Sequence, residues 1–210
     1  MLNILIADDH PIVREGIRQV IENNFEVNVM DEVGTSQEAL EKVWKQRYDV
    51  ILLDISMPGR SGLEVLRELR REQVQTPILI LSVHPEKQYA VRALKAGASG
   101  YLTKMSATEE LEDAIRILLK GEKYISPSLA MALAEYIEAG ERESPHELLT
   151  DREFEVMSMI ASGNSLKEIA HELSLSVKTI SAHRAHILKK MDMSSNAELI
   201  RYAIETDLLQ

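Results

Sequence analysis

The stretch Val50-Ile51-Leu52-Leu53-Asp54-Ile55-Ser56-Met57-Pro58-Gly59 decides the fold of the first half of the chain. Its first four residues form a continuous apolar run, and two similar runs occur at Ile4-Leu5-Ile6 and Ile78-Leu79-Ile80-Leu81. A short apolar run without alternation is typical of a strand buried on both faces, as in a parallel sheet. The stretch therefore predicts a buried strand that ends at the acidic residue Asp54.

Weaker strand candidates lie at residues 27–33 and 100–102, and helical patterns separate the predicted strands. In these patterns apolar residues repeat at three- and four-residue spacing, in segments 12–21, 39–43, 63–69, 91–95 and 111–119. Five strands that alternate with five helices imply right-handed βαβ units and a sheet covered on both sides. We therefore expect a doubly wound α/β fold with a five-stranded parallel sheet, the flavodoxin-like arrangement.

The second half differs, because only helical periodicity remains from Thr150 onward. Thr150 and Glu153 fit a capping box at the start of a helix. A short helix at 166–173 precedes a tight turn, in which Ser176 can cap a second helix at 177–191. The inward positions of that second helix are Val177, Ile180, Ile187, Leu188 and Met191. This pattern predicts an all-α helix-turn-helix domain.

The two patterns divide the chain into three segments. We expect a first domain at residues 1–122, a linker with its own helix at 123–146, and the helix-turn-helix domain at 147–210. Within the linker, residues 127–137 have a helical pattern, whereas residues 140–145 are polar and contain a glycine and a proline.

The bulk composition excludes several classes of protein. The chain has no cysteine, which excludes disulfides and thiolate metal sites and suits a reducing cytoplasm. No basic segment precedes the N-terminal apolar residues, and no apolar run approaches the length of a membrane span. We therefore expect a cytoplasmic protein without a membrane partner.

Polar side chains follow four of the predicted strands, at the edge of the sheet where ligands bind in such folds. Asp8 and Asp9 follow the first strand, and Asp54, Ser82 and Lys104 follow the third, fourth and fifth. Three neighbouring carboxylates repel one another, so the site calls for a hard cation such as Mg²⁺. Asp54 can then act as a nucleophile and form an aspartyl phosphate, with Lys104 and Ser82 contacting the phosphoryl oxygens.

These residues, with the stretch Asp54 to Gly59, Gly62 and His10, resemble the signature of response-regulator receiver domains. The resemblance implies that Asp54 is the phosphoacceptor for a sensor histidine kinase, and that phosphoryl transfer and autodephosphorylation are self-catalysed rather than those of an enzyme. It implies that Mg²⁺ is bound by Asp9, Asp54 and the backbone carbonyl of Ser56, while Asp8 holds a metal-bound water. Ser82 and Tyr101 occupy the two switch positions.

Two features of the pocket stay open at the level of sequence. Met105 follows Lys104 where many receivers have a proline after a cis peptide bond, so this bond is either cis or trans. Ser56 and His84 lie two residues beyond Asp54 and Ser82, where receivers tune the lifetime of the phosphoryl group. We predict that replacing Ser56 and His84 changes the rate of autodephosphorylation.

The net charge of −10 argues against a nucleic-acid partner, but its distribution does not. Residues 174–191 contain four Lys or Arg residues and no acid. A basic, hydroxyl-rich helix after a short turn is what a recognition helix in the DNA major groove requires. We therefore expect double-stranded DNA as a partner.

The stretches Leu149 to Glu153, Lys167 to Ala170 and Thr179 to His183 resemble the LuxR-type domain, and the whole chain resembles the NarL/FixJ family of response regulators. The resemblance implies backbone contacts from Lys178, Thr179 and Lys189, and base contacts from Ser181, Ala182, Arg184 and Ala185. Ser181 stands where the family often has lysine, and serine reads bases less selectively. In the family the last helix, at 196–205 here, supplies a dimer contact, which implies Leu199, Ile200 and Ala203 and an inverted-repeat DNA site.

Phosphorylation has to be coupled to DNA binding. Our hypothesis is that Ser82 moves toward the phosphoryl group, Tyr101 turns inward, and the DNA-binding domain is released and dimerises. Two alternatives remain: a haloacid dehalogenase-like phosphatase, which needs an acid at the position of Ser56, and a regulator that binds DNA without phosphorylation. The sequence leaves open the kinase, the signal, the operator, the target genes, activation or repression, and whether the receiver dimerises.

Overall fold

The computed structural model describes residues 1–139, 144–206 and 208, leaving aside the side chains of residues 87, 88 and 139. The chain divides into two compact units, residues 1–138 and 139–210, which we describe separately. Most of the polar segment expected at 140–145 lies outside the described residues. None of the described helices is long and apolar enough to cross a membrane.

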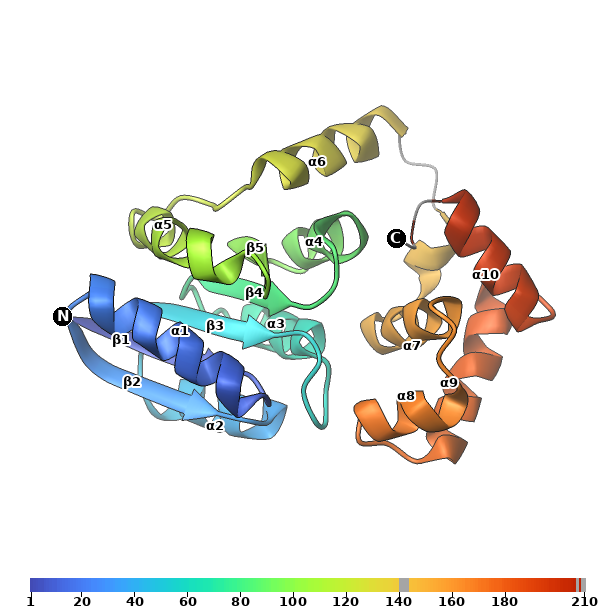
Figure 1. Cartoon of the computed structure of the whole chain (residues 1–210), viewed down its shortest axis with the longest axis horizontal. Coiled ribbons are helices and arrows are strands. Elements are labelled where there is room, and N and C mark those ends of the chain that lie inside the picture. Colours follow the sequence, from blue (N-terminus) through green and yellow to red (C-terminus); the bar gives the residue numbers. More distant parts are fainter. Residues whose placement is uncertain (140–143, 207, 209–210) are drawn as a thin grey trace. The chain divides into compact units, whose positions relative to one another are not determined.

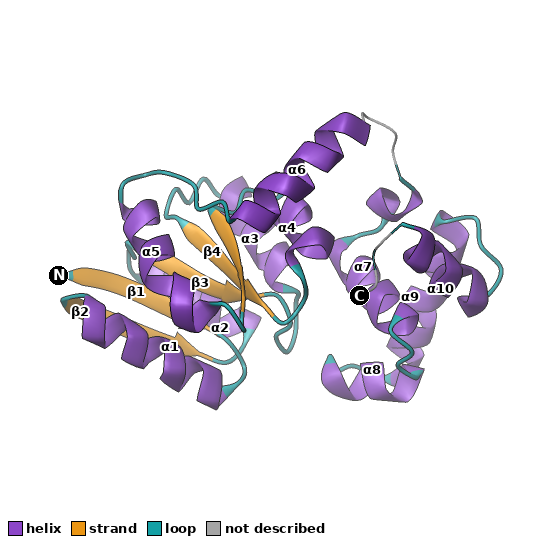
Figure 2. Cartoon of the chain, turned by 45° about the horizontal axis from the view of Figure 1, so that its top comes forward, coloured by secondary structure: helices purple, strands orange, loops and turns teal. Residues whose placement is uncertain are grey.

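The first unit has a five-stranded parallel sheet between two layers of helices (Figures 1 and 2). The strands are β1 (Leu2–Ala7), β2 (Val27–Val33), β3 (Val50–Asp54), β4 (Ile78–Ser82) and β5 (Gly100–Thr103), in the order β2-β1-β3-β4-β5. The helices are α1 (Pro11–Asn24), α2 (Ser36–Lys45), α3 (Gly62–Arg71), α4 (Glu86–Lys95) and α5 (Ala107–Leu119). The predicted doubly wound fold is confirmed.

The core explains why the strands have continuous apolar runs. Every residue of β3 and β4 is buried, because helices cover both faces of the sheet. On the face covered by α1 and α5, strand residues such as Leu52 pack against Ile17 and Ile21 of α1 and Leu111 of α5. Each such side chain contributes about 1.5–3 kcal/mol by burial. This core fixes the strand ends, and with them the polar residues that follow.

The helix expected at 127–137 is α6 (Pro127–Ala139), and it packs on the first unit. Tyr124 precedes it and pairs with Gly100 at the edge of the sheet. The Ser126 hydroxyl accepts a hydrogen bond from the Leu129 amide at 3.1 Å and donates one to Glu86 Oε2 of α4 at 2.6 Å. The first unit therefore extends beyond residue 122, to Glu138.

The second unit is helical, as the sequence predicts. It contains the short helix η1 (Pro145–Leu148), followed by α7 (Asp151–Ala161), α8 (Leu166–Glu172), α9 (Val177–Lys190) and α10 (Asn196–Glu205). The predicted capping box of Thr150 and Glu153 is present, and Ser176 accepts a hydrogen bond from the Thr179 amide at 3.0 Å. Val177 is 43% exposed, so its predicted inward position is wrong. It is the first residue of α9, which places its side chain beyond the packed face of the helix.

Candidate phosphoacceptor site and DNA-binding surface

The polar residues at the strand ends come together in one buried pocket. Asp8 follows β1, Asp54 ends β3, Ser82 ends β4, and all three are at most 1% exposed. Lys104 follows β5, and its Nζ lies 2.7 Å from Oδ2 of Asp8 and 2.7 Å from Oδ2 of Asp54. The parallel order of the strands brings these side chains to one edge, because the carboxyl ends of all five strands meet there.

The charges in this pocket shift one another's pKa values. Burial raises the pKa of the Asp54 carboxyl to about 7; the Lys104 ammonium opposes this shift, and the Asp8 carboxylate adds to it. Burial alone would lower the pKa of Lys104, but its ion pairs with Asp54 and Asp8 hold it above the ordinary value. The lysine therefore stays charged and offsets part of the repulsion between the two carboxylates.

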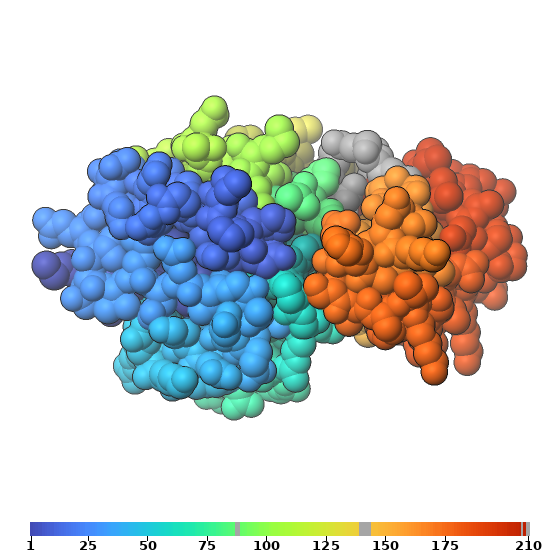
Figure 3. Space-filling model, turned by 60° about the horizontal axis from the view of Figure 1, so that its bottom comes forward, coloured from blue at the N-terminus to red at the C-terminus, as the bar shows by residue number. Residues whose placement is uncertain are grey.

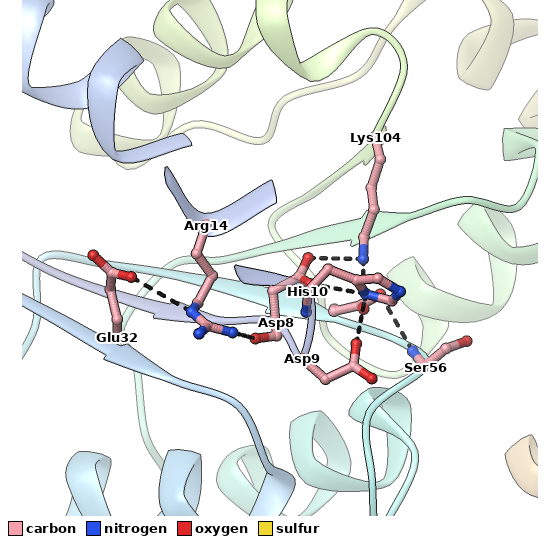
Figure 4. A network of polar contacts seen from close by, with 8 residues as sticks. Asp8, Asp9, His10, Arg14, Glu32, Ser56 and Lys104 are labelled. Atoms are coloured by element: carbon pink, nitrogen blue, oxygen red, sulfur yellow. Dashed lines mark hydrogen bonds and ion pairs between the residues drawn. The ribbon is translucent and has the colours of Figure 1, made fainter. Parts of the chain in front are cut away.

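The carboxylates also form a group that can hold a metal ion. Ligand atoms of Asp8, Asp9, His10 and Asp54 lie within 4.8 Å of one another. Carboxylate oxygens are hard donors of the kind Mg²⁺ prefers, so three of these residues fit that ion. Figure 4 shows how His10 joins the cluster: its Nδ1 lies 2.6 Å from Asp9 Oδ1, and its amide donates to Asp8 Oδ1 at 2.8 Å. We assigned no metal-site role to His10 from the sequence, although it directly follows the two acids.

The loop after β3 wraps around the phosphoacceptor. The Ser56 amide donates a hydrogen bond to Asp54 Oδ1 at 3.2 Å, so the backbone of this residue lies beside the carboxylate. Gly62 is required where the loop returns, because a Cβ there would overlap the carbonyl oxygen of Asp54. On the other side of the pocket, the peptide bond between Lys104 and Met105 is trans, as are all the others described.

The two predicted switch residues meet at His84. The His84 amide donates to Ser82 Oγ at 3.0 Å, and the Tyr101 hydroxyl donates to the His84 carbonyl at 2.8 Å. The His84 ring stacks on Tyr89 of α4 at 4.5 Å between centroids, and burial lowers its pKa to about 4, with Lys104 adding to the shift. Tyr101 is already inside, at 0% exposure. The structure therefore has the inward orientation of Tyr101, and the movement of Tyr101 on phosphorylation stays a prediction.

Arg14 of α1 is a further contact that sequence reasoning missed. Its guanidinium donates to the backbone carbonyl of Asp8 and pairs with Glu32 of β2 at 3.4 Å (Figure 4). It thereby fixes the turn that carries Asp8 and Asp9. The sequence offers only an arginine at the start of a helix, which is ordinarily a solvated residue.

In the second unit, α9 presents most of the predicted DNA contacts to solvent. The exposed residues are Lys178, Ser181, Ala182, Ala185 and Lys189. Thr179 is half-buried, and its Oγ1 lies 2.8 Å from Ser176 Oγ. Arg184 is also half-buried, and its Nε donates to Oδ1 of Asn196 in α10 at 2.6 Å. The opposite face of α9 packs in the domain core through Ile180, Ile187 and Leu188.

An ion pair fixes the end of α9. Lys190 Nζ lies 2.6 Å from Oε2 of Glu153, which also completes the capping box of α7. Burial alone would raise the pKa of Glu153. Lys190 and the Thr150 amide and hydroxyl, which all donate hydrogen bonds to the Glu153 carboxylate, instead hold this pKa below its usual value. The C-terminal end of α9 is therefore joined to the N-terminal end of α7.

The burial of residues in α10 contradicts part of the predicted dimer contact. Leu199 and Ala203 are 0% and 1% exposed, so they belong to the core of their own domain and cannot supply a dimer contact. Ile200 is half-buried, and Ile204 is 64% exposed on the outer face. The apolar periodicity identified the helix, but it did not show which of its apolar residues pack inward.

A doubly wound domain with an acidic, lysine-bridged pocket, joined to a helix-turn-helix domain, defines the class of DNA-binding response regulators. Residues 4–116 match the response regulator receiver domain, and residues 147–203 match the bacterial regulatory proteins of the luxR family. The chain belongs to the NarL/FixJ family of response regulators, which are regulatory DNA-binding proteins rather than enzymes.

Two relatives are similar to this chain in sequence over nearly their whole length. Response regulator UvrY of Escherichia coli (strain K12) is 36% identical over 209 residues, which cover 99% of this chain and 96% of that protein. Oxygen regulatory protein NreC of Staphylococcus carnosus is 36% identical over 215 residues, covering 99% of each.

Solved structures of RcsB are similar along nearly the whole chain. RcsB from Salmonella enterica serovar Typhimurium, bound to promoter rprA in the presence of phosphomimetic BeF3-, has a TM-score of 0.63 at 30% identity, covering 96% of this chain and 98% of that one. A structure of two RcsB dimers bound to two parallel DNAs has a TM-score of 0.61 at 30% identity, covering 96% and 97%.

Proposed function

We propose that this response regulator accepts a phosphoryl group on Asp54 from a sensor histidine kinase, in a Mg²⁺-dependent reaction, and then binds DNA as a dimer to regulate transcription. The observation that carries the proposal is the buried contact of Lys104 with both Asp54 and Asp8. A phosphoryl group on Asp54 carries more negative charge than the carboxylate it replaces. Lys104 is already in place to contact its oxygens.

In the reaction, an oxygen of the Asp54 carboxylate attacks the phosphorus of the kinase phosphohistidine. The new O–P bond forms, the N–P bond breaks, and the imidazole leaves with the electron pair and takes a proton from solvent. Lys104 and the Ser82 hydroxyl bind phosphoryl oxygens. Mg²⁺, held by Asp9, Asp54 and the Ser56 carbonyl, with Asp8 acting through a bound water, would neutralise the developing charge.

Autodephosphorylation follows when water attacks the same phosphorus in line with the Asp54 oxygen: the new O–P bond forms, the bond from phosphorus to Asp54 breaks, inorganic phosphate leaves, and the Asp54 carboxylate is regenerated. Ser56 and His84 lie two residues beyond Asp54 and Ser82, and the Ser56 amide contacts the Asp54 carboxylate. The resemblance to receiver domains implies that these two positions limit the approach of that water. Replacing them should change the lifetime of the phosphoryl group and leave its formation intact.

We propose residues 1–122 as the receiver domain, 123–146 as the linker and 147–210 as the DNA-binding domain. The exposed basic face of α9 supports insertion into the major groove, with Lys178, Thr179 and Lys189 on phosphates and Ser181, Ala182, Arg184 and Ala185 at the bases. We propose that the dimer contact comes from the exposed face of α10, including Ile200 and Ile204, and that the DNA site is an inverted repeat. The solved structure of RcsB dimers bound to DNA supports DNA binding as a dimer.

The direct test combines acetyl phosphate and Mg²⁺ with mass measurement of the intact protein. The wild-type chain should gain one phosphoryl group, and Asp54→Ala should gain none. Genome-wide mapping of bound DNA with wild-type and Asp54→Ala proteins then tests the link to transcription. A chain that gains no phosphoryl group but binds the same DNA sites as its Asp54→Ala variant would instead be a regulator that works without phosphorylation.

A further inference from the structure

Ser36 is a buried polar residue that contacts neither Asp54 nor Lys104 in the hydrogen bonds described. It is the first residue of α2, and it is only 3% exposed. Its side chain faces the loop of residues 55–61, which joins Asp54 of β3 to α3. This loop contains Ser56, whose amide contacts the Asp54 carboxylate and whose carbonyl is a proposed Mg²⁺ ligand.

The hydroxyl of Ser36 forms hydrogen bonds with the loop on both sides of Gly59. It donates a hydrogen bond to the Pro58 carbonyl at 3.1 Å and accepts one from the Arg60 amide at 2.9 Å. A single side-chain oxygen therefore satisfies a backbone acceptor and a backbone donor that lie two residues apart. Neither group has a strand or helix to pair with at this point of the chain.

Gly59 lies between these two hydrogen bonds and has a left-handed backbone conformation. Its φ is +97°, a region that residues with a side chain rarely adopt, and a Cβ at this position would lie 2.8 Å from Ser36 Oγ. The loop can approach the hydroxyl this closely only with glycine here. Glycine is also the residue that constrains the backbone least, so contacts from other elements contribute to keeping the loop in one conformation.

The ends of the loop are held independently of Ser36. The Ile55 amide donates to the Leu81 carbonyl at 3.3 Å, and the Gly62 amide donates to the Ile55 carbonyl at 2.8 Å. These two bonds close the base of the loop next to the sheet. Ser36 acts on its outer half, at residues 58–60, and this contact comes from another element of the fold.

We propose that Ser36 is a positioning residue for phosphorylation: its hydroxyl holds the loop of residues 55–61 so that the Ser56 backbone stays in place beside Asp54. The inference rests on the proposed function, because it assumes that this loop completes the Mg²⁺ and phosphoryl site. Ser36→Ala leaves the Pro58 carbonyl and the Arg60 amide without their partner, so the loop samples conformations in which Ser56 has moved away.

The experiment compares Ser36→Ala with Ser36→Thr, which keeps a hydroxyl, and with Thr35→Ala as a matched control. Thr35 is the neighbouring N-cap of α2, and its side chain accepts from the Glu38 amide, so this variant weakens the same helix without touching the loop. In each full-length protein, hydrogen exchange of the Arg60 amide is measured. Mg²⁺ affinity is measured from amide chemical shifts, and the phosphorylation rate is measured with acetyl phosphate.

Ser36→Ala should increase Arg60 exchange and weaken Mg²⁺ binding, each by about three- to tenfold, while Ser36→Thr restores both toward wild type. Thr35→Ala should leave both unchanged at a similar loss of thermal stability. Equal Mg²⁺ affinity in Ser36→Ala and Thr35→Ala would overturn the proposal, and so would rapid Arg60 exchange in the wild-type protein, which needs no variant to fold. Failure of the wild-type chain to take up phosphoryl groups would instead count against the proposed function, since exchange and Mg²⁺ binding are read without that step.

Discussion

The Nζ atom of Lys104 lies 2.7 Å from Oδ2 of Asp54, inside a pocket where the aspartate is almost fully buried. The same ammonium also lies 2.7 Å from Asp8. One cation therefore holds two carboxylates that would otherwise repel each other in a low-dielectric environment. A phosphoryl group on Asp54 would add negative charge next to this cation, which makes Lys104 the residue best placed to sense the modification.

We expect Lys104→Met to slow phosphorylation of Asp54. The variant leaves Asp54 and Asp8 without their cation, so the pKa of Asp54 should rise above about 7, and fewer molecules would have an ionised nucleophile. Phosphorylation by acetyl phosphate should slow by roughly 100-fold or more, the loss typical of removing one charge-stabilising group. The control is Lys123→Met, at an exposed position outside the pocket, which should react at the wild-type rate. A wild-type rate in Lys104→Met would contradict the assignment.

The fold and the pocket follow from the sequence for one reason: parallel strands end at the same edge. Once the apolar runs predict the strands, Asp8, Asp54 and Lys104 have to meet. Contacts made by residues in other elements do not follow in this way. Ser36 belongs to a helix start, and nothing in the sequence shows that its hydroxyl faces a loop some 20 residues later. The buried position of Leu199 was missed for a related reason, because periodicity does not show which neighbour a helix packs against.

The titration of His84 should make the free energy of unfolding of the receiver depend on pH. Its pKa is lowered from 6.5 to about 4 by burial, with Lys104 adding to the shift. A histidine with a depressed folded-state pKa contributes stability above its unfolded-state pKa, and this contribution is lost as the pH falls from about 6.5 toward 4. Its loss should destabilise the wild-type receiver by up to about 3 kcal/mol over that interval.

The measurement is urea unfolding of wild type and His84→Phe at several pH values between 4 and 7. Phenylalanine keeps a ring for the stack on Tyr89 and removes the titration. The variant should show a shallower decrease of unfolding free energy in acid. Parallel pH profiles, or an NMR titration that places the histidine near its ordinary pKa, would show that the ring is accessible to protons.

The contact between Ser126 and Glu86 should control how firmly α6 is docked on α4. Ser126 is 4% exposed, caps α6 through the Leu129 amide, and donates to the buried Glu86 carboxylate at 2.6 Å. Ser126→Ala removes the cap and one donor of a buried charge, which together cost about 2 kcal/mol or more. Hydrogen exchange of the Leu129 amide should increase accordingly. Ser128→Ala is the matched control, because Ser128 is exposed and contacts the same carboxylate without capping Leu129; an equal effect in both variants would assign the loss to Glu86 alone.

The two faces of α10 should respond to substitution in opposite ways. Leu199→Ala should destabilise the second unit by about 2–5 kcal/mol, because Leu199 is fully buried. Ile204→Ala should change stability by less than about 0.5 kcal/mol, since Ile204 is 64% exposed. Sedimentation of the phosphorylated proteins distinguishes the roles: Ile204→Ala should weaken dimerisation at unchanged stability. A full-strength dimer in that variant would place the dimer contact elsewhere.

Asn196 should influence DNA recognition without touching DNA. Its Oδ1 accepts a hydrogen bond from Arg184 Nε at 2.6 Å, and this bond fixes the direction in which the guanidinium leaves α9. A tethered arginine can offer its remaining N–H groups to base acceptors in one geometry, and a bidentate contact of this kind distinguishes bases by about 1–3 kcal/mol. Asn196→Ala frees the side chain, so discrimination should fall at the base pair that Arg184 reads, while affinity for other sequences changes little.

Selection of binding sites from a random double-stranded library shows this directly. Asn196→Ala and Arg184→Ala should relax the preference at the same position of the site, with the larger effect in Arg184→Ala. Lys178→Ala is the control: a phosphate contact should weaken binding to all sequences alike and reduce the salt dependence by about one charge, without changing the preferred sequence. If Asn196→Ala keeps the wild-type preference while Arg184→Ala loses it, the arginine is oriented by the DNA itself and the hydrogen bond to Asn196 serves only the packing of α9 against α10.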